Sequence, residues 1–375
     1  MANVRFVGLD VHAETITVAV AETTGEVRAL GTIPNRPEPV RRLVRKLGPL
    51  HHLRVCYEAG PTGYVLYWQL VGLGVHCDVV APSLVPTRAG DRVKTDRRDA
   101  EKLARGYRAG DLTPVWVPDA EHEALRDLVR AREAAKKDQL RARHRLGKFL
   151  LRHGRRRPAH LKMAWTAGHM DWIRAVRFES TAQQIVLADY LHEVERVATR
   201  IAHLNQAILE AVRTAPPQMR AVIQALQALR GVAAVSAATI VAEVGQLSRF
   251  ENPRQLMGYS GLVPSEYSTG ARRRLGAITK TGNAHLRRVV IEAAWAYRFG
   301  PAVREPLRAR QVGLDPAVTE IAWRAQKRLH ERYRTLVAKG KNNNQVMTAV
   351  GRELLGFIWD IARTVEQQVP IAATA

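Results

Sequence analysis

The sequence predicts an α/β domain followed by a largely helical remainder, and three observations support this division. The first third of the chain alternates strand-like and helix-like patterns, and the spacing becomes helical from about Glu121. A stretch punctuated by glycines, from Gly258 to Gly282, interrupts the later helical pattern. With 375 residues and 46% hydrophobic content, the chain is long enough for two or three domains with a sizeable core.

Three consecutive strands are predicted first. "VRFVGLD" has the pattern of a buried strand that ends in an acid, and apolar and polar residues alternate in "ETITVAVAE" and "EVRALGTI", with a turn at "TTGE" between them. Helical spacing follows in "PVRRLVRKLG", a fourth strand in "LRVCYEA", a helix in "GYVLYWQLVGLG" and a fifth strand in "VHCDVVAP". A third helix is predicted from "KTDRRDA". The order β-β-β-α-β-α-β-α indicates an α/β sandwich in which the fourth strand lies parallel to the first.

The middle of the chain is predicted to be a strongly cationic helical region. Between Arg126 and Arg157 there are 13 basic and 3 acidic residues. Apolar residues then recur mostly at steps of three and four, at Leu187, Leu191, Val194, Val197, Ile201, Leu204, Ile208 and Val212. This spacing leaves three alternatives open: an antiparallel coiled coil, a seam between two chains, or an amphipathic helix packed in its own domain.

The last part of the chain is predicted to be mainly helical, beginning after a break at "TAPPQ", residues 214–218. Its opening, "LRGVAAVSAATIVAEVG", is similar to a helix-hairpin-helix, a turn whose backbone N–H groups can bind phosphate near a helix N-terminus. Ala233 replaces the glycine that is usual in that turn. The predicted domains are therefore residues 1–118, 119–218 and 219–365.

Charge and cysteine content narrow the function classes. The 58 Lys and Arg residues against 35 Asp and Glu give a net charge of +23, which indicates a polyanionic partner, above all nucleic acid; an arginine bias from GC-rich coding is the alternative. Cys56 and Cys77 lie in apolar runs, so we expect neither a disulfide scaffold nor a cysteine-built zinc site. The longest nearly apolar run, from Gly231, stops at Glu243, short of the roughly 18 to 20 residues that span a bilayer, so we expect a soluble cytoplasmic protein without membrane contact.

Four acidic residues fall where a functional site is expected in an α/β sheet. Asp10 ends the first strand and Glu58 ends its predicted parallel neighbour, so both lie at the carboxyl edge of the sheet. Asp96 and Asp99 are three residues apart and share one face of the following helix, which can close over that edge. Oxygen ligands without Cys or His select Mg²⁺ or Mn²⁺, which assist phosphodiester cleavage. Taken singly, Asp96 could serve only as a helix cap and Asp10 as a turn former.

Basic residues surround these acids, and we expect Lys94, Arg97 and Arg98 to hold the nucleic-acid backbone there. A second basic cluster, between Tyr267 and Arg288, has six basic residues and no acid. The contacts expected in this cluster are Arg272, Arg273, Arg274, Lys280 and Arg287.

The second cluster also contains two hydroxyls, Ser268 and Thr269, beside Gly270. A hydroxyl on a glycine-bearing loop flanked by cations can act as a nucleophile in phosphoryl transfer, although a simple turn is the commoner role for this pattern. His12 and His285 flank the two sites. Each is expected to support a ligand or contact a phosphate rather than act as a general base.

These residues lie in motifs that resemble the insertion sequence 110 and 1111 family of transposases. The motifs cover nearly the whole chain and include "GLDVHAETITVAV", "YEAGPTGYVLYWQL", "KTDRRDAEKLARGYRAGDL", "GLVPSEYSTGARRRLGAITKTGNAHLRR" and "AWRAQKRLHERYRTLVAKGK". The resemblance implies an N-terminal domain of the RuvC and RNase H-like α/β class, with a DEDD metal site at Asp10, Glu58, Asp96 and Asp99. It further implies a helical coiled-coil segment and a mainly helical C-terminal transposase domain with a catalytic serine directly before a glycine.

The chain departs from the family at the nucleophile, because Thr269 stands directly before Gly270 and Ser268 lies one residue earlier. The β-methyl group of threonine restricts χ1 and crowds in-line attack. Three alternatives stay open: Thr269 is the nucleophile, Ser268 is the nucleophile, or this copy is impaired.

The resemblance implies a recombinase whose hydroxyl attacks a DNA phosphodiester and forms a covalent phospho-enzyme, assisted by Mg²⁺ or Mn²⁺. It also implies donor and target DNA, a structured noncoding guide RNA called a bridge RNA, and a homo-oligomer that is a tetramer of paired dimers. Such a protein would act at the bacterial nucleoid. Two other hypotheses are a stand-alone nuclease that resembles a Holliday-junction resolvase and needs no hydroxyl, and a catalytically inactive nucleic-acid-binding protein.

Overall fold

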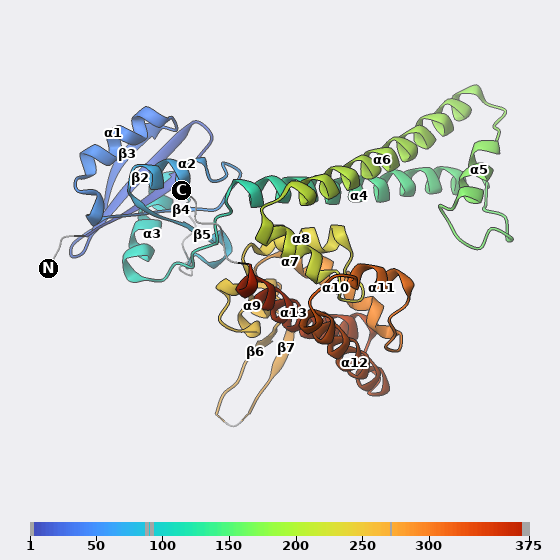
Figure 1. Ribbon diagram of the computed structural model, residues 1–375. Coiled ribbons are helices and arrows are strands. Elements are labelled where there is room, and N and C mark those ends of the chain that lie inside the picture. The colour runs from blue at the N-terminus through green and yellow to red at the C-terminus, as the bar shows by residue number, and fades with distance from the viewer. Residues whose placement is uncertain (1–3, 87–89, 91–93, 271, 370–375) are drawn as a thin grey trace. The chain divides into compact units, whose positions relative to one another are not determined.

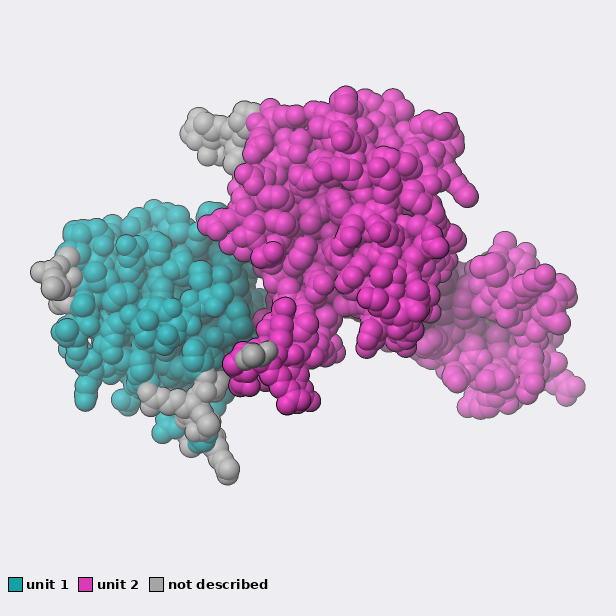
Figure 2. Space-filling model, turned by 90° about the horizontal axis from the view of Figure 1, so that it is seen from below, with its two compact units in different colours: residues 1–117 teal, residues 118–375 magenta. Residues whose placement is uncertain are grey.

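The computed structural model describes residues 4–86, 90, 94–270 and 272–369, and it divides into two compact units, Met1–Val117 and Pro118–Ala375 (Figure 1, Figure 2). The N-terminal unit is an α/β domain and the C-terminal unit is mainly helical, so the predicted fold class is confirmed. The division into domains 1–118, 119–218 and 219–365 stays a prediction. Within the described residues, no helix has both the length and the apolar character needed to cross a membrane.

The N-terminal unit contains a five-stranded sheet in the order β3-β2-β1-β4-β5. Strand β1 pairs antiparallel with β2 and parallel with β4, as predicted. The elements, in chain order, are β1 (Arg5–Val11), β2 (Thr15–Glu22), β3 (Arg28–Pro34), α1 (Pro37–Leu47), β4 (Leu53–Glu58), α2 (Val65–Gly72), β5 (His76–Val80) and α3 (Asp96–Ala109).

The two faces of this sheet carry different helices. On one face, alternate strand residues such as Leu9 and Tyr57 pack with α1 and α2 in a single apolar core. On the other face, Ala19 and Ala21 of β2 pack against Ala100 and Ala104 of α3. Small side chains on both sides of this second contact allow α3 to lie close to the sheet.

The C-terminal unit begins with two long helices, α4 (Ala120–Arg152) and α6 (Thr181–Thr214), which are connected through α5 (Ala167–Ala175) (Figure 1). They pack antiparallel, since Ala135 meets Val197 and Ile201 while Leu146 lies in one cluster with Leu187. The apolar residues from Leu187 to Leu204 therefore pack against α4 of the same chain, whereas Ile208 and Val212 pack in the large core of the helical domain. An antiparallel pair of helices within the chain, one of the three alternatives, is therefore present.

The rest of this unit is a helical domain with one β-hairpin. Its elements are α7 (Pro217–Leu226), α8 (Ala234–Val244), α9 (Pro253–Ser260), β6 (Pro264–Glu266), β7 (Leu275–Ile278), α10 (Ala284–Ala294), α11 (Glu305–Gln311), α12 (Pro316–Ala338) and α13 (Asn343–Gln368). Buried residues of α13, including Leu354 and Ile358, lie in one large core with those of α7, α8, α10 and α12. The β6–β7 hairpin occupies the stretch where glycines interrupt the helical pattern.

Gly231 lies in the turn between α7 and α8, with φ +85°. A Cβ atom there would lie 2.3 Å from the carbonyl oxygen of Ala293, so only glycine allows this turn to approach α10. Two helices joined by a turn, as expected for the helix-hairpin-helix-like stretch "LRGVAAVSAATIVAEVG", are thus present, and the turn is held against a neighbouring helix.

Candidate functional site

The alternation of side chains along β1 and β4 places Asp10 and Glu58 on the face of the sheet that α3 covers. Leu9 and Tyr57 point into the core on the opposite face, and the neighbouring side chains must point the other way. The parallel register pairs Leu9 with Tyr57, so Asp10 and Glu58 follow at the same level of the sheet edge. The predicted side-by-side placement of these two acids is therefore a consequence of strand register.

Gly8 lets α3 reach this edge. An ideal Cβ atom at position 8 would lie 2.4 Å from both the carbonyl oxygen of Ala100 and the backbone nitrogen of Ala104. The helix backbone thus passes directly over β1, two residues before Asp10. This close approach brings the first turn of α3, which carries Asp96 and Asp99, to the end of β1.

Thr95, rather than Asp96, caps this helix, because its Oγ1 accepts a hydrogen bond from the backbone N–H of Arg98 at 3.3 Å. Asp96 is therefore the first helical residue and its carboxylate is not used as a cap. Acids in the first turn are also favoured by the positive end of the helix dipole.

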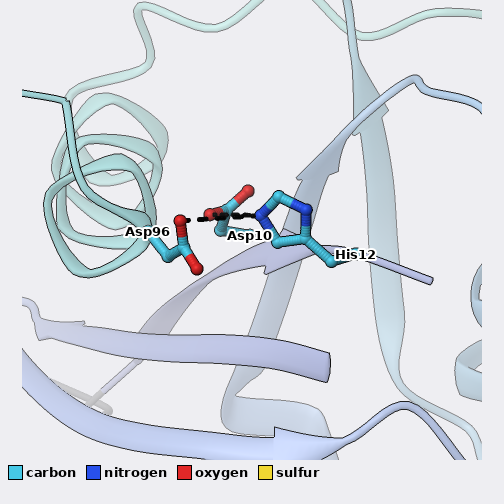
Figure 3. A group of neighbouring side chains, drawn as sticks. All are labelled: Asp10, His12 and Asp96. Atoms are coloured by element: carbon cyan, nitrogen blue, oxygen red, sulfur yellow. Dashed lines mark hydrogen bonds and ion pairs between the residues drawn. The ribbon is translucent and has the colours of Figure 1, made fainter. Parts of the chain in front are cut away.

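Asp10, His12 and Asp96 form a compact group of possible metal ligands (Figure 3). Their ligand atoms all lie within 4.8 Å of one another. The Nε2 atom of His12 is 3.3 Å from Oδ2 of Asp10 and 3.7 Å from Oδ1 of Asp96. From the sequence, His12 is expected to support a ligand or contact a phosphate, not to be a ligand itself. The sequence feature that could have indicated a ligand role is its position two residues after Asp10, because side chains two residues apart lie on the same side of extended backbone.

Glu58 and Asp99 act on this group through their charge. Burial raises the pKa of the Asp10 carboxyl, and Asp96 and Asp99 raise it further, against the opposing effect of His12. Burial also raises the pKa of Glu58, and Asp99 and Asp10 add to that increase, although Lys102 and Lys94 oppose it. Asp10 therefore repels the other acids, and Glu58 and Asp99 repel each other, but Glu58 and Asp99 are not part of the compact ligand group of Asp10, His12 and Asp96.

This arrangement fits a divalent cation. Several oxygen donors and one imidazole nitrogen converge, and their mutual repulsion is what a bound cation relieves. Basic side chains lie beside these acids: Lys94 is 3.9 Å from Asp99, and Arg97 pairs with Glu101 at 2.9 Å. The negative charge of the four acids Asp10, Glu58, Asp96 and Asp99, here called the acid group, is thus only partly neutralised by lysine side chains.

The two predicted hydroxyls lie at the exposed end of the β6–β7 hairpin. The Ser268 hydroxyl donates a hydrogen bond to Oε1 of Glu266 at 2.7 Å. Arg273 holds the same carboxylate through two nitrogens, each 3.1 Å from an oxygen. Hydrogen bonds from Ser268 and Arg273 lower the pKa of Glu266, so this carboxylate stays ionised and acts as an acceptor.

Thr269 is held differently, through its backbone. Its N–H donates to the carbonyl oxygen of Arg272 at 3.2 Å, and the N–H of Arg272 donates back to Thr269 at 3.1 Å. Gly270 follows with φ +56° in the tight turn. Among the described residues, the Thr269 hydroxyl has no hydrogen-bond partner.

The base of the hairpin is packed around two glycines. Gly261 and Gly282 both have positive φ, and Cβ atoms there would lie 2.1 Å from the carbonyl oxygen of Thr281 and 2.2 Å from that of Tyr259. Arg287, predicted to contact nucleic acid, donates from Nη1 to the carbonyl oxygen of Ser260 at 2.7 Å.

The other basic residues expected in this region have exposed side chains, namely Arg272, Arg273, Arg274 and Lys280. Lys280 also has φ +56°, which is uncommon for a residue with a side chain.

A third polar region lies on the α4–α6 coiled coil. A groove of about 540 Å³ is lined there by Arg141, His144, Arg145, Lys148, Phe149, Arg152 and Tyr190. Four of these side chains are permanently cationic, and two are aromatic. This combination of cations and ring faces suits a nucleic-acid strand.

The chain is similar to known transposases, both to family models and to individual proteins. Residues 7–154 match a family model for DEDD transposases of the IS110 group, and residues 223–308 match the model of the IS116/IS110/IS902 transposase family. The chain is 46% identical over 365 residues to y4qE of Sinorhizobium fredii, named as a transposase, which covers 96% of this chain and 89% of that protein.

Two further relatives have lower sequence identity to this chain. The transposase for insertion sequence element IS1533 of Leptospira borgpetersenii is 32% identical over 340 residues, 90% of this chain and 97% of its own length. The pilin gene-inverting protein of Moraxella bovis is 22% identical over 277 residues, 73% of this chain and 67% of its own length. The chain belongs to the IS116/IS110/IS902 family of transposases, enzymes that cut and recombine DNA.

Proposed function

We propose that this transposase recombines DNA through the hydroxyl of Ser268, assisted by a divalent cation at Asp10, Glu58, Asp96 and Asp99. The observation that carries the proposal is the exposed Ser268 hydroxyl, which donates to a carboxylate that Arg273 fixes. A nucleophile whose partner is itself oriented by a third group is the usual arrangement in covalent catalysis. The acid group at the sheet edge supports the metal-assisted part of the proposal.

The choice of Ser268 over Thr269 rests on how each hydroxyl is held. Ser268 has an ionised acceptor at 2.7 Å, whereas the backbone of Thr269 is paired on both sides with Arg272. The resemblance places the family serine directly before the glycine, the position of Thr269. A threonine at that position leaves the neighbouring serine as the less crowded hydroxyl.

In the proposed step, Oγ of Ser268 forms a bond to phosphorus and its proton passes to the Glu266 carboxylate. The bond from phosphorus to one deoxyribose oxygen breaks, and that oxygen leaves and takes up a proton. The reverse reaction with a second DNA end releases the serine and joins the strands, so no phosphodiester energy is lost to hydrolysis. Arg272 and Arg274 would contact the phosphate backbone beside the hydroxyl.

A bound Mg²⁺ or Mn²⁺ would supply charge stabilisation for phosphate oxygens during cleavage. The chain's own acids would hold it: Asp10 and Asp96 on one side, with Glu58 and Asp99 close by. Lys94, Arg97 and Arg98 would guide the DNA backbone toward this edge.

We also propose that donor and target DNA are selected by a structured noncoding guide RNA, with the chain working as a dimer that forms a tetramer on DNA. The family resemblance supports this part of the proposal, together with the basic groove between Arg141 and Arg152. Base pairing would then supply the sequence specificity, while the protein binds backbone and shape. We place this activity at the nucleoid in the bacterial cytoplasm.

The test is a recombination assay with the cognate RNA, donor and target DNA and Mg²⁺, in which covalent protein–DNA adducts are trapped on a denaturing gel. Ser268→Ala, Thr269→Ala and Asp10→Ala are compared with wild type, and Ser265→Ala on the same hairpin is the matched control. We expect Ser268→Ala to abolish both adduct and recombination, Asp10→Ala to abolish recombination, and Ser265→Ala to retain both.

Other results favour other hypotheses. Loss of the adduct only in Thr269→Ala would make Thr269 the nucleophile. Cleavage without an adduct that depends on Asp10 but on neither hydroxyl would indicate a nuclease that resembles a Holliday-junction resolvase. Nucleic-acid binding without cleavage in any condition would indicate an inactive binding protein.

A further inference from the structure

We infer that His12 is a direct nitrogen ligand of the cation held by the acid group, so that the metal site has mixed nitrogen and oxygen donors. The inference rests on the proposed function, because it concerns the same metal site. Nε2 of His12 faces both Asp10 and Asp96, at 3.3 Å and 3.7 Å, and the two carboxylates lie on the same side of the ring (Figure 3).

The backbone holds His12 in this position. Its N–H donates to the carbonyl oxygen of Thr15 at 2.8 Å, which closes the turn between β1 and β2. Its own carbonyl oxygen accepts a hydrogen bond from Nδ2 of Asn35 at 2.8 Å. With its backbone bonded at both groups, His12 can reorient only its ring, and the strand spacing already directs that ring toward Asp10.

The distances suit coordination. Two donors at right angles, each about 2.1 Å from an ion, lie about 3 Å apart. The two distances from Nε2 are slightly longer, so small side-chain rotations are enough to close them around an ion. The His12 side chain is 54% exposed, which leaves it free to rotate and leaves the group open to ions from solvent.

A nitrogen donor changes which metal the site prefers. Mg²⁺ favours oxygen ligands, whereas imidazole suits transition metals. The chain should therefore bind Mn²⁺ more tightly than Mg²⁺. Removal of the imidazole should weaken Mn²⁺ binding by at least about tenfold, with a smaller effect on Mg²⁺.

The experiment uses the full-length protein loaded with Mn²⁺ alone. Pulsed electron paramagnetic resonance detects nitrogen bound to Mn²⁺ through its nuclear modulation, and protein with ¹⁵N-labelled histidine identifies the nitrogen as imidazole. We expect nitrogen modulation in wild type and its loss in His12→Ala.

His76→Ala is the matched control. His76 also lies two residues from an aspartate on a strand, with Nε2 3.2 Å from Oδ2 of Asp78. No second acid joins that pair to form a ligand group among the described residues. The modulation should persist in this variant.

The outcomes separate the two proposals. Saturable Mn²⁺ binding that is lost in Asp10→Asn but shows no nitrogen modulation would overturn the inference and leave the acid metal site standing. Modulation that survives in His12→Ala would overturn it as well. An absence of saturable Mn²⁺ binding would overturn both the inference and the metal-assisted function.

Discussion

At the scale of single residues, the geometry of this site depends on a glycine as well as on the acidic side chains. Gly8 has no side chain, and that absence permits α3 to cross β1 directly above it. Asp96 and Asp99 reach the end of β1 only because of this contact. Without the space at this glycine, the two acids of α3 would lie farther from Asp10.

Gly8→Ala should therefore damage both stability and the metal site. The new methyl group would overlap backbone atoms of Ala100 and Ala104, so the helix must move and take Asp96 with it. We expect a loss of about 1 to 3 kcal/mol in unfolding free energy and weaker Mn²⁺ binding. Urea unfolding and metal titration measure the two effects. Gly72→Ala is the control, since a Cβ atom there meets nothing within 4 Å, and an equal loss in both variants would contradict the explanation.

At the scale of elements, buried ion pairs join α4 to the helices beside the hairpin. Glu243 of α8 is fully buried and accepts two hydrogen bonds from Arg130 of α4, at 2.8 and 2.9 Å. The Asn283 amide also donates to it at 2.8 Å while its oxygen caps α10. Because a buried charge is costly without its partners, this network fixes α4 against the base of the β6–β7 hairpin.

Glu133 of α4 makes a second such connection, and it predicts a pH dependence. Burial alone would raise its pKa, but hydrogen bonds from His285, Lys137 and Arg288 outweigh this and lower the pKa to about 2. A lowered pKa means that the stabilisation is complete above the ordinary value of 4.5 and is lost as pH falls toward 2. The stability difference between wild type and Glu133→Gln should shrink across that window.

Unfolding free energies measured between pH 2 and 6 provide the check. Glu320→Gln, at an exposed position on α12, removes a charge outside this network and serves as the control. A difference between wild type and Glu133→Gln that stays constant with pH would show that Glu133 is not held by these partners.

At the scale of the whole molecule, the net charge of +23 should make nucleic-acid binding strongly dependent on salt. The groove on α4 and α6 predicts where part of this dependence arises. Arg145→Ala and Lys148→Ala should each weaken nucleic-acid binding and reduce the slope of log Kd against log salt concentration by about one. Arg213→Ala is the control, because Arg213 already pairs with Glu210 at 2.6 Å. Unchanged slopes in the groove variants would show that this groove does not bind the nucleic-acid backbone.

The sequence by itself determined the fold class, the strand order along the chain and the family. Alternation with a period of two and spacing of three to four are local properties, so strands and helices can be recognised without knowing their neighbours. The positions of Asp10 and Glu58 at strand ends, and of Asp96 and Asp99 on one helix face, follow from the same periodicities. Motifs such as "KTDRRDAEKLARGYRAGDL" carried the family resemblance, and the comparisons confirmed it.

Only the tertiary structure decided which side chains meet. His12 faces both Asp10 and Asp96 because α3 crosses β1 at Gly8, a contact between segments about 90 residues apart in the chain. The same holds for the coiled coil, because apolar spacing alone fits a partner in the same chain or in another. The hydrogen bond from Ser268 to Glu266 depends on the conformation of the β6–β7 hairpin, which includes Gly270 in its turn. Local patterns set the elements, whereas close packing between distant segments set the distances on which chemistry depends.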